Sequence, residues 1–440
     1  MIKTVKFGGS SLASGGQFEK VKKIVTADSE RKIVVVSAPG RRSSGDSKVT
    51  DLLYICHAHI KYKVSYEDIL SQIKERYDEI ISYCKLDISL DEDFEKIKKD
   101  IKNGANIDYL VSRGEYLCAK LMACYLGFEF FDSKDWLFFD FEGNIDFEKS
   151  QKAFSEFAET HEYIVVPGFY GMGANGKIKT FSRGGSDITG SVAAYLIDAD
   201  SYENWTDVPG ILMADPRIVE NPKSIGKITF NELRELSYMG AEVLHEDAVF
   251  PVRDKNIPLY IKNTNDITAD GTLITDLIED DDIDKASHFI TGISGKKHFS
   301  IITMGKSKLS EQTGYIRKAL AIAEKYDIVP EHIPSSIDSF SLVVSTPVLS
   351  GCLHELITEI TETLSPDFVK VTNHISLVAV VGRNMASKPG TAGKLFAALG
   401  NNGINVRMIE QGADEINIIV GVESKDFEKT INVLYDSFAK

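Results

Sequence analysis

The chain has few cysteines and no long apolar run, and these two absences exclude several classes of protein. Its 440 residues include five cysteines, none of them in a Cys-x-x-Cys pair. An odd number without such a pair indicates free thiols in a reducing compartment. No apolar stretch approaches the roughly 20 residues that a membrane-spanning helix needs, and the start of the chain has no signal-peptide core. We therefore expect a cytoplasmic protein with no membrane partner.

Positive charge and metal-ligand patterns are also scarce. Lys and Arg total 50 against 65 Asp and Glu, a net charge of −15, which argues against nucleic acid or an anionic membrane as the main partner. The nine histidines show no metal-ligand spacing, since His57 and His59 would point to different faces of a helix. We expect no structural metal. The content of 43% apolar and 26% charged residues is that of an ordinary globular protein with two or three domains.

Two adjacent glycines follow a short strand at the start of the chain. Ile2 to Val5 alternates in the manner of a strand, and the next residues are Lys6-Phe7-Gly8-Gly9-Ser10-Ser11. Glycines lack Cβ atoms and can turn their amide N–H groups toward an anion, while a lysine at the strand end adds a mobile charge. The pattern predicts a cradle for the phosphates of a nucleotide. A tight strand-to-helix turn is the alternative.

A second glycine pair precedes a predicted buried helix. The sequence there reads Ser182-Arg183-Gly184-Gly185-Ser186-Asp187 and continues in small and apolar residues to Leu196. Arg183 offers a planar fork for a carboxylate or phosphate, and Asp187 either caps the helix or faces the site. Two glycine-rich anion sites, one with Lys and the other with Arg and Asp, are typical of phosphoryl transfer.

A third glycine-rich segment matches two nucleotide motifs, and we reject both matches. Residues 171–178 fit G-x-G-x-x-G and nearly fit the P-loop pattern, but both motifs require a helix immediately afterwards. Lys177 to Phe181 alternates like a strand, and Ile178 stands where a P-loop has a Mg²⁺-binding Ser or Thr. We expect a hairpin or loop.

These motifs, taken together, resemble those of the aspartokinases, members of the amino acid kinase superfamily. Both glycine motifs match, and further matches follow in the same order at Ser112-Arg113-Gly114-Glu115, Gly168-Phe169, Trp205 to Ile211, Asp215-Pro216-Arg217 and Val243-Leu244-His245. The resemblance covers essentially the whole chain. It implies a three-layer αβα sandwich over residues 1–284, followed by a regulatory region, 285–440, of two ACT-like α+β (βαββαβ) domains. Their approximate bounds are 296–372 and 373–440, and interleaving of the two stays open.

The resemblance also implies a reaction and a set of site residues. Aspartokinases transfer the γ-phosphoryl group of ATP, with Mg²⁺ arriving as MgATP, to the β-carboxylate of L-aspartate. Lys6 and Asp187 match the catalytic positions. Glu115 would receive the substrate ammonium and Arg183 the α-carboxylate, although by spacing alone an acid near a helix start only favours the helix dipole. The remaining substrate-binding positions are Thr50, Phe169, Gly184 and Ser186.

The nucleotide site maps by the same resemblance onto Lys6, Gly8, Gly9, Ser10, Ser37, Thr206, Asp207, Leu212 and Arg217. Two departures from the family pattern fall near it. Leu212 stands where many relatives have an aromatic residue that could stack on the nucleotide. Glu242 stands where many have Lys, which reverses the local charge. Because Lys6, Arg183 and Asp187 are intact, we keep the kinase interpretation.

A polar loop precedes Thr50. Residues 31–36 predict a buried parallel strand, and the segment from Arg41 to Asp51 is rich in Ser and polar residues, which favours a mobile loop closing over substrate. The simple alternative for Thr50 is an N-cap of the following helix.

The C-terminal region repeats itself. A shift of 76 residues places Ile302 on Val378, Gly314 on Gly390 and Val344 on Val420. Each copy has the pattern strand, helix, two strands, helix, which resembles a tandem pair of ACT domains. In aspartokinases these bind an end-product amino acid and often build the dimer, so we expect a homodimer or a dimer of dimers through them. Glu331 matches an acidic residue of lysine-sensitive relatives, which makes lysine the leading effector and threonine the second.

Two other functions remain open at this point. Another amino acid kinase, acting on glutamate or acetylglutamate, would keep the glycine motifs but would not explain the paired C-terminal modules. A non-catalytic amino acid sensor would follow if Glu242 marked a degenerate nucleotide site.

Overall fold

The computed structural model describes residues 1–182, 184–241, 244, 246–277, 290–385, 388–412 and 416–439. The chain forms two compact units. The first contains Met1–Ile211, Ser224–Phe230 and Val243–Ile278, and the second contains Leu212–Lys223, Asn231–Glu242 and Glu279–Lys440. Two short stretches of the region expected to be catalytic thus pack with the C-terminal unit. The division expected at residue 284 stays a prediction, because 278–289 lie outside the described residues.

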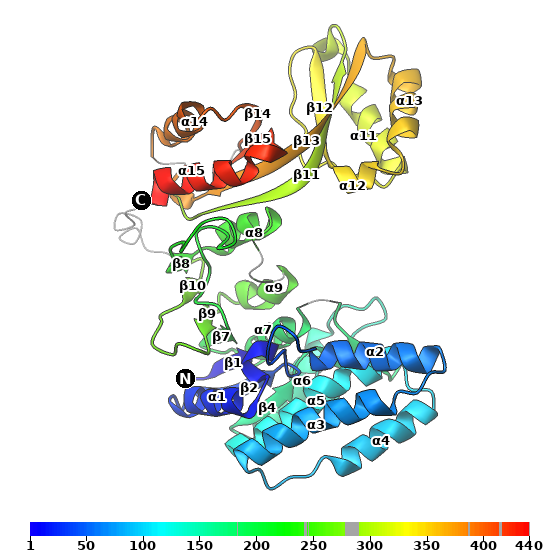
Figure 1. The fold of residues 1–440 in the computed structure, drawn as a ribbon, viewed down its shortest axis with the longest axis vertical. Helices are drawn as coiled ribbons and strands as arrows, with labels where there is room; N and C mark the ends of the chain where they lie inside the picture. Colours follow the sequence, from blue (N-terminus) through cyan, green and yellow to red (C-terminus); the bar gives the residue numbers. More distant parts are fainter. Residues whose placement is uncertain are drawn as a thin grey trace. The chain divides into compact units, whose positions relative to one another are not determined.

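An eight-stranded sheet forms the centre of the first unit (Figure 1). Neighbouring strands run parallel except for one antiparallel pair, β9 and β10. Residues such as those of β2, Arg-Lys-Ile-Val-Val-Val, suit a strand that is covered on both faces. The order across the sheet is β3 (Glu129–Phe130), β4 (Ile164–Pro167), β2 (Arg31–Val36), β1 (Lys3–Phe7), β7 (Ser201–Thr206), β9 (Leu259–Asn263), β10 (Thr272–Ile274) and β8 (Lys227–Ile228).

Helices cover both faces of this sheet, so the expected three-layer αβα sandwich is confirmed. Alternate strand residues belong to two separate cores: Val34 and Val36 face one, while Ile33 and Val35 face the other. The first core is completed by α1 (Gly15–Thr26), α2 (Val49–Lys61), α3 (Glu67–Cys84), α4 (Asp91–Lys102) and α5 (Ile107–Leu126). The second is completed by α6 (Phe147–Ala158), α7 (Gly185–Leu196) and α9 (Glu246–Asp254).

The rejected glycine motif forms a hairpin, as expected. β5 (Tyr170–Met172) pairs antiparallel with β6 (Ile178–Thr180), and Gly176, at φ 71°, lies in the connecting turn. The Thr180 hydroxyl donates to Asp108 of α5 at 2.7 Å, which fixes the hairpin on the helical layer.

The second unit is built on one antiparallel sheet that both repeats share. Its order is β12 (Ser339–Ser345), β11 (Gly292–Gly305), β13 (Phe368–Val381), β15 (Asn417–Glu423) and β14 (Val406–Glu410). β11 and β13 are long strands that pair with each other over most of their length. The N-terminal half of β11 therefore lies beside the strands of the second repeat. The N-terminal half of β13 lies beside the strands of the first repeat. The helices are α11 (Tyr315–Lys325), α12 (Thr346–Leu349), α13 (Leu353–Leu364), α14 (Thr391–Asn401) and α15 (Phe427–Ala439).

The first copy departs from the expected strand, helix, two strands, helix pattern. Between α11 and β12 only isolated bridges occur, at His332 and Ser335. Glu331 donates its N–H to Val343 at 2.8 Å, but Pro330 and Pro334 have no N–H to continue the ladder. In the second copy, where no proline intervenes, β14 is a strand that pairs antiparallel with β15, with one register shift between Val406 and Met408.

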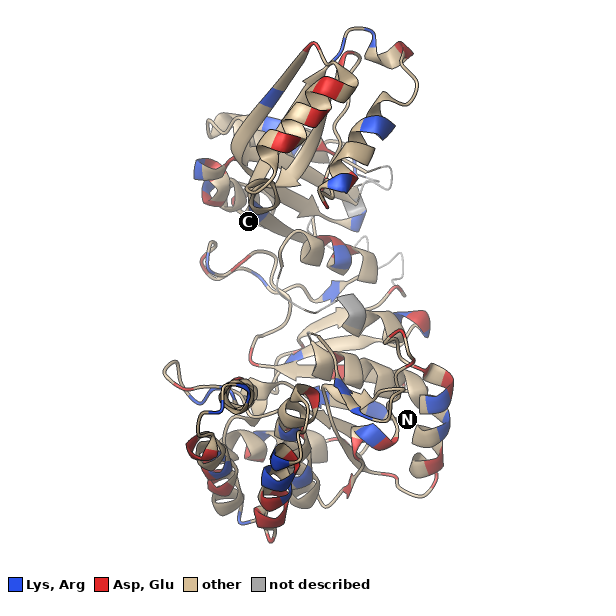
Figure 2. Cartoon of the chain, turned by 90° about the vertical axis from the view of Figure 1, so that its right-hand side faces the viewer, with Lys and Arg blue, Asp and Glu red and all other residues tan. Residues whose placement is uncertain are grey.

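Charges of both signs are interspersed along the helices (Figure 2). α3 and α4 turn their charged faces outward. In the described part of the chain, no helix combines the length and apolarity that crossing a bilayer would need.

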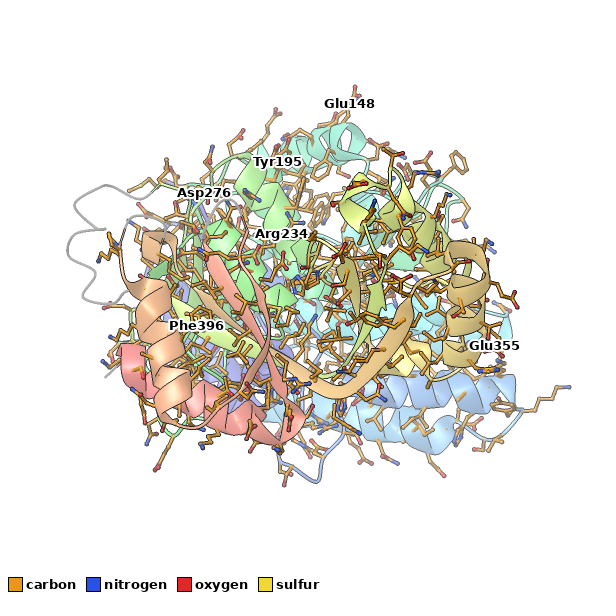
Figure 3. The ribbon with its side chains drawn as sticks, turned by 90° about the horizontal axis from the view of Figure 1, so that it is seen from above. Glu148, Tyr195, Arg234, Asp276, Glu355 and Phe396 are labelled. Carbon is orange, nitrogen blue, oxygen red and sulfur yellow. The ribbon has the colours of Figure 1, made fainter. Side chains whose placement is uncertain are left out.

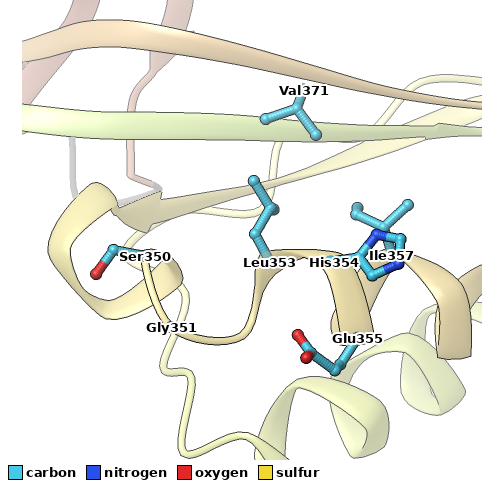
Figure 4. A pocket seen from close by; sticks show the side chains of 7 residues that line it. All are labelled: Ser350, Gly351, Leu353, His354, Glu355, Ile357 and Val371. Carbon is cyan, nitrogen blue, oxygen red and sulfur yellow. The ribbon is translucent and has the colours of Figure 1, made fainter.

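One pocket of about 530 Å³ lies in the second unit, at the start of α13. Leu353 points toward Val371 of β13 (Figure 4), and Glu355 extends outward (Figure 3). None of the site residues expected from the sequence lines this pocket.

Candidate active site

Four parallel strands of the first unit end at the same edge of the sheet, and most of the expected site residues follow those ends. Gly8 donates its N–H to the Trp205 carbonyl at 3.0 Å, and Ser37 donates to Phe7 at 3.2 Å. Gly168 donates to Val36 at 2.9 Å. These bonds bring the residues after β1, β2, β4 and β7 together. The carboxyl edge of a parallel sheet is where ligands bind in open α/β folds.

Lys6 and Asp187 form an ion pair at this edge. The Lys6 Nζ lies 2.5 Å from Asp187 Oδ1, and the two side chains are 8% and 21% exposed. Lys6 occupies the position of β1 that faces α7, while Val5 and Phe7 face the opposite core. The alternation of side chains along β1 directs Lys6 toward α7, and the first turn of α7 supplies Asp187 as its partner.

Asn204 completes the cluster, and the sequence analysis missed it. Its amide nitrogen donates to Asp187 Oδ1 at 2.8 Å, and its amide oxygen accepts from Lys6 Nζ at 3.3 Å. It stands directly opposite Lys6 in the β1–β7 register. The available signal was a polar amide inside a buried strand, where an uncompensated polar group is costly.

In the first glycine motif, Gly9 rather than Gly8 lies in close contact with the backbone of residues 38–40. The Gly8 N–H is used by Trp205, so the expectation that both glycine amides face an anion is wrong for Gly8. No hydrogen-bond acceptor for the N–H of Gly9 or Ser10 is found in the described residues. A Cβ at Gly9 would lie 2.9 Å from the Ala38 carbonyl oxygen, and a Cβ at Gly40 would lie 2.6 Å from the Gly9 carbonyl carbon. Gly9 and Gly40 are therefore packed backbone against backbone.

The second glycine motif begins α7. Gly184, at φ 59°, is the N-cap residue in the left-handed region, where an L side chain is disfavoured. Asp187 lies in the first turn but makes no cap hydrogen bond, so of the two alternatives it faces the site. A Cβ on Gly168 would lie 2.6 Å from Ser186 Oγ, which places Ser186 beside the end of β4. Arg183, expected to bind the substrate carboxylate, lies outside the described residues.

Phe169 has a strained backbone. Its φ is 81°, which costs about 1–3 kcal/mol for a residue with a side chain. The conformation is held from both sides, since Phe169 donates its N–H to Thr189 Oγ1 at 3.0 Å and accepts from the Phe181 N–H at 3.0 Å. Such strain is concentrated at functional sites.

Glu115 is a buried carboxylate in the middle of a helix. α5 begins at Ile107, after the Asn106 side chain caps the Tyr109 N–H, so the expectation that Glu115 lies near a helix start is wrong. It is 4% exposed, and its Oε2 has no hydrogen-bond partner among the residues that the structure describes. Burial raises the pKa of Glu115 to about 8, partly offset by a backbone hydrogen bond from Ala38. Glu115 lies beside residues 37–40, and its Oε2 is available to accept a hydrogen bond from a cationic group of a ligand.

Thr50 is the second residue of α2, and the N-cap position belongs to Lys48. The interpretation of Thr50 as a helix cap is therefore wrong. The Val49 N–H donates to Pro39 at 3.1 Å, which brings the start of α2 next to the end of the β2 segment.

The expected nucleotide residues are divided between the units. Thr206 ends β7 and Asp207 follows it. The Thr206 hydroxyl donates to Asp207 at 3.2 Å, and the Thr264 N–H donates to the Thr206 carbonyl at 2.8 Å. Leu212 and Arg217 belong to the second unit, where Arg217 pairs with Asp215 at 2.7 Å. Glu242 lies outside the described residues. Among the described residues, no group of three or more acidic, His or Cys side chains could hold a metal ion.

Glu331 of the first repeat is hydrogen-bonded within the second unit. The Tyr238 hydroxyl donates to Glu331 Oε2 at 2.5 Å, and burial together with this bond raises the pKa of Tyr238 to about 12. Tyr238 ends α8 (Phe230–Tyr238), and the same helix carries Glu232, which is buried and paired with Arg383 at 2.8 Å.

Comparison with known proteins agrees with this geometry. Residues 1–263 match the model of the amino acid kinase family, and residues 378–438 match an ACT domain model. The chain is 37% identical over 452 residues to aspartokinase 3 of Bacillus subtilis, covering 99% of this chain and 98% of that protein. The solved aspartate kinase of Clostridium acetobutylicum has a TM-score of 0.90 and 49% identity, with 99% of both chains covered. Escherichia coli aspartokinase III in complex with lysine and aspartate shares the fold, with a TM-score of 0.73, 23% identity and 100% of both chains covered.

The contact between the two glycines predicts the effect of adding a single methyl group. Gly40→Ala should lower the free energy of unfolding by about 1–3 kcal/mol, because the new Cβ would overlap the Gly9 backbone. Urea unfolding followed by circular dichroism measures this. Gly45→Ala, in the same loop with no atom within 4 Å of its Cβ, is the control and should leave stability unchanged. Equal stability of the two variants would contradict the close contact.

Proposed function

The chain belongs to the amino acid kinase family and, within it, to the aspartokinases, and on that premise we propose that it phosphorylates L-aspartate. The γ-phosphoryl group of ATP is transferred directly to the β-carboxylate, which gives 4-phospho-L-aspartate and ADP. One carboxylate oxygen forms the new bond to phosphorus, and the bond to the ADP oxygen breaks. The acceptor carboxylate is already ionised at neutral pH, so no general base is required.

The observation that carries the proposal is the Lys6–Asp187 pair at the first glycine motif, where a Cβ on Gly8 would lie 3.6 Å from Lys6 Nζ. Lys6 neutralises charge on the transferred group, and Asp187 with Asn204 holds the ammonium in place. The amide N–H groups of Gly9 and Ser10 supply further hydrogen-bond donors to the phosphates. Mg²⁺ enters with ATP and is held mainly through phosphates and waters.

The amino acid substrate is oriented by opposite charges in our proposal. Its ammonium binds the buried Glu115 carboxylate, and its α-carboxylate binds Arg183. Thr50, the strained Phe169, and the Gly184 and Ser186 segment line the remaining surface. Fixing both ends of a zwitterion leaves the side-chain carboxylate free to react.

The nucleotide is bound by Ser37, Thr206 and Asp207 together with the first glycine motif. We retain Leu212 and Arg217 as nucleotide contacts from the resemblance, although they belong to the second unit. A coupled assay of ADP formation and a hydroxamate assay with aspartate, glutamate and acetylglutamate test the reaction. If glutamate or acetylglutamate is phosphorylated and aspartate is not, the proposed substrate is wrong. If an amino acid binds but no ADP forms, the protein is a sensor.

Regulation is assigned to the C-terminal repeats. We propose that lysine binds the first copy through Glu331, with threonine as the second candidate. The complex of E. coli aspartokinase III with lysine supports an amino acid effector in this fold. We also propose a homodimer, or a dimer of dimers, formed through the same repeats.

Removing either member of the ion pair should suppress catalysis. Lys6→Met and Asp187→Ala are each expected to lower kcat by about 10²-fold or more, the usual cost of deleting one transition-state contact. The circular dichroism spectrum should remain native. Lys3→Met, on the same strand but bonded to Asp28 and Glu30 at the surface, is the matched control and should keep near-normal turnover. Full activity of Lys6→Met would refute the assigned role.

The buried acid predicts a pH dependence of substrate affinity. With a raised pKa of about 8, Glu115 is mostly protonated below pH 8 in the free enzyme, and binding an ammonium must release that proton. The KM for aspartate should therefore fall about tenfold per unit from pH 6 toward pH 8 and then level off. Glu115→Gln should raise KM and remove this slope. A slope that persists in Glu115→Gln would assign it to another group.

The effector assignment predicts a selective loss of inhibition. Glu331→Gln should raise the lysine concentration for half-inhibition about tenfold or more, because a charged hydrogen bond is lost. Glu355→Gln, an exposed acid of the same repeat in the α13 pocket, serves as the control and should retain the wild-type response. Titrations with lysine and threonine, separately and together, measure both. Unchanged lysine inhibition in Glu331→Gln would exclude this residue.

A further inference from the structure

Arg76 is a buried cation on the inner side of α3. It is 4% exposed, whereas most charges of this helix are turned to solvent. Its guanidinium donates to the Gly40 carbonyl at 2.6 Å and to the Ser47 carbonyl at 2.9 Å, and it lies 3.1 Å from Asp46 Oδ2. Removing a guanidinium from water is costly, so three acceptors on one loop mark a specific contact.

The loop that Arg76 contacts closes on itself. The Val49 N–H donates to the Pro39 carbonyl, and the Asp46 N–H donates to Ser43 at 3.2 Å. Arg42 binds Asp46 from the solvent side at 2.9 Å, and this hydrogen bond is the main cause that holds the pKa of Asp46 well below its ordinary value. Arg76 contacts both ends of the closed loop from inside the protein.

One end of this loop is the glycine that contacts the phosphate motif. Gly40 donates its N–H to the Gly9 carbonyl at 2.7 Å, and its Cα packs against the Gly9 backbone without space for a Cβ. The Gly40 carbonyl is the group that Arg76 holds. A displacement of Gly40 is therefore passed to Gly9, because close-packed backbone atoms cannot move independently.

An arginine suits this task better than a lysine. The planar guanidinium directs several N–H donors along fixed directions, so it can hold the Gly40 and Ser47 carbonyls at one separation. A lysine ammonium is a point charge on a flexible stem and fixes no such separation. Arg42, 39% exposed in its side chain, shares Asp46 but makes no bond to Gly40 in the described residues.

We infer that Arg76 is a positioning residue for phosphoryl transfer, which acts through Gly40 to place the Gly9 amide against the phosphates of ATP. The inference rests on the proposed aspartate kinase reaction. Arg76 itself need not touch either substrate.

Steady-state kinetics on Arg76→Lys and Arg76→Met, with Arg42→Met as the matched control, test the inference. The KM for MgATP should rise about tenfold in both Arg76 variants while the KM for aspartate stays within about twofold, since misplacing a contact by an ångström is costly. Arg42→Met should resemble the wild type. If Arg76→Met does not fold, Arg76→Lys decides the outcome alone.

A purely structural role would give a different pattern. Loss of stability lowers the active fraction, and hence kcat, without changing the KM for MgATP, and that result would overturn the inference. In Arg76→Ala, millimolar guanidinium should restore MgATP affinity, whereas equal sodium chloride should not; failure of the rescue would also count against it. A wild-type enzyme without aspartate-dependent ADP formation would instead refute the proposed function.

Discussion

The ion pair between Lys6 and Asp187 constrains the rest of the catalytic unit. The two side chains are 8% and 21% exposed, so each charge is largely shielded from water and depends on the other for compensation. The pair joins the end of β1 to the first turn of α7, and Asn204 ties both to β7. The two glycine motifs, distant in sequence, must then meet at one edge of the sheet. In the sheet β1 lies between β2 and β7, and this order places Lys6 directly opposite Asn204.

Most of the fold could be predicted because its signals are local. Buried parallel strands, the two glycine corners, the hairpin that resembles a dinucleotide motif and the internal repeat all depend on periodicity or on residues close in sequence. The three-layer arrangement followed from the family resemblance. The interrupted second strand of the first repeat could have been expected from Pro330 and Pro334, whose missing N–H groups break a ladder whatever the homologous copy does.

The parts that could not be predicted depend on partners far along the chain. Asn204 is significant only because the register of β1 and β7 places it opposite Lys6. Gly40 is required because Gly9 lies against it, and nothing in the sequence around Gly40 records that contact. Glu115 was expected near a helix start, whereas α5 already begins at Ile107. In the fold, Gly114 lies inside α5, where a Cβ would be 2.8 Å from the Ala38 side chain.

Lys6 and Glu115, the two buried ionisable residues of the site, differ in their surroundings, and this difference indicates different roles. Lys6 has a permanent protein partner, so its charge is present and oriented before any ligand arrives. Glu115 Oε2 has no such partner within the described part of the chain, and burial makes the charged form of Glu115 unfavourable. A group meant to stabilise a transition state benefits from preorganisation, whereas a group meant to select a cation benefits from being unsatisfied until that cation binds. The same low-polarity surroundings therefore favour catalysis at one residue and substrate selection at the other.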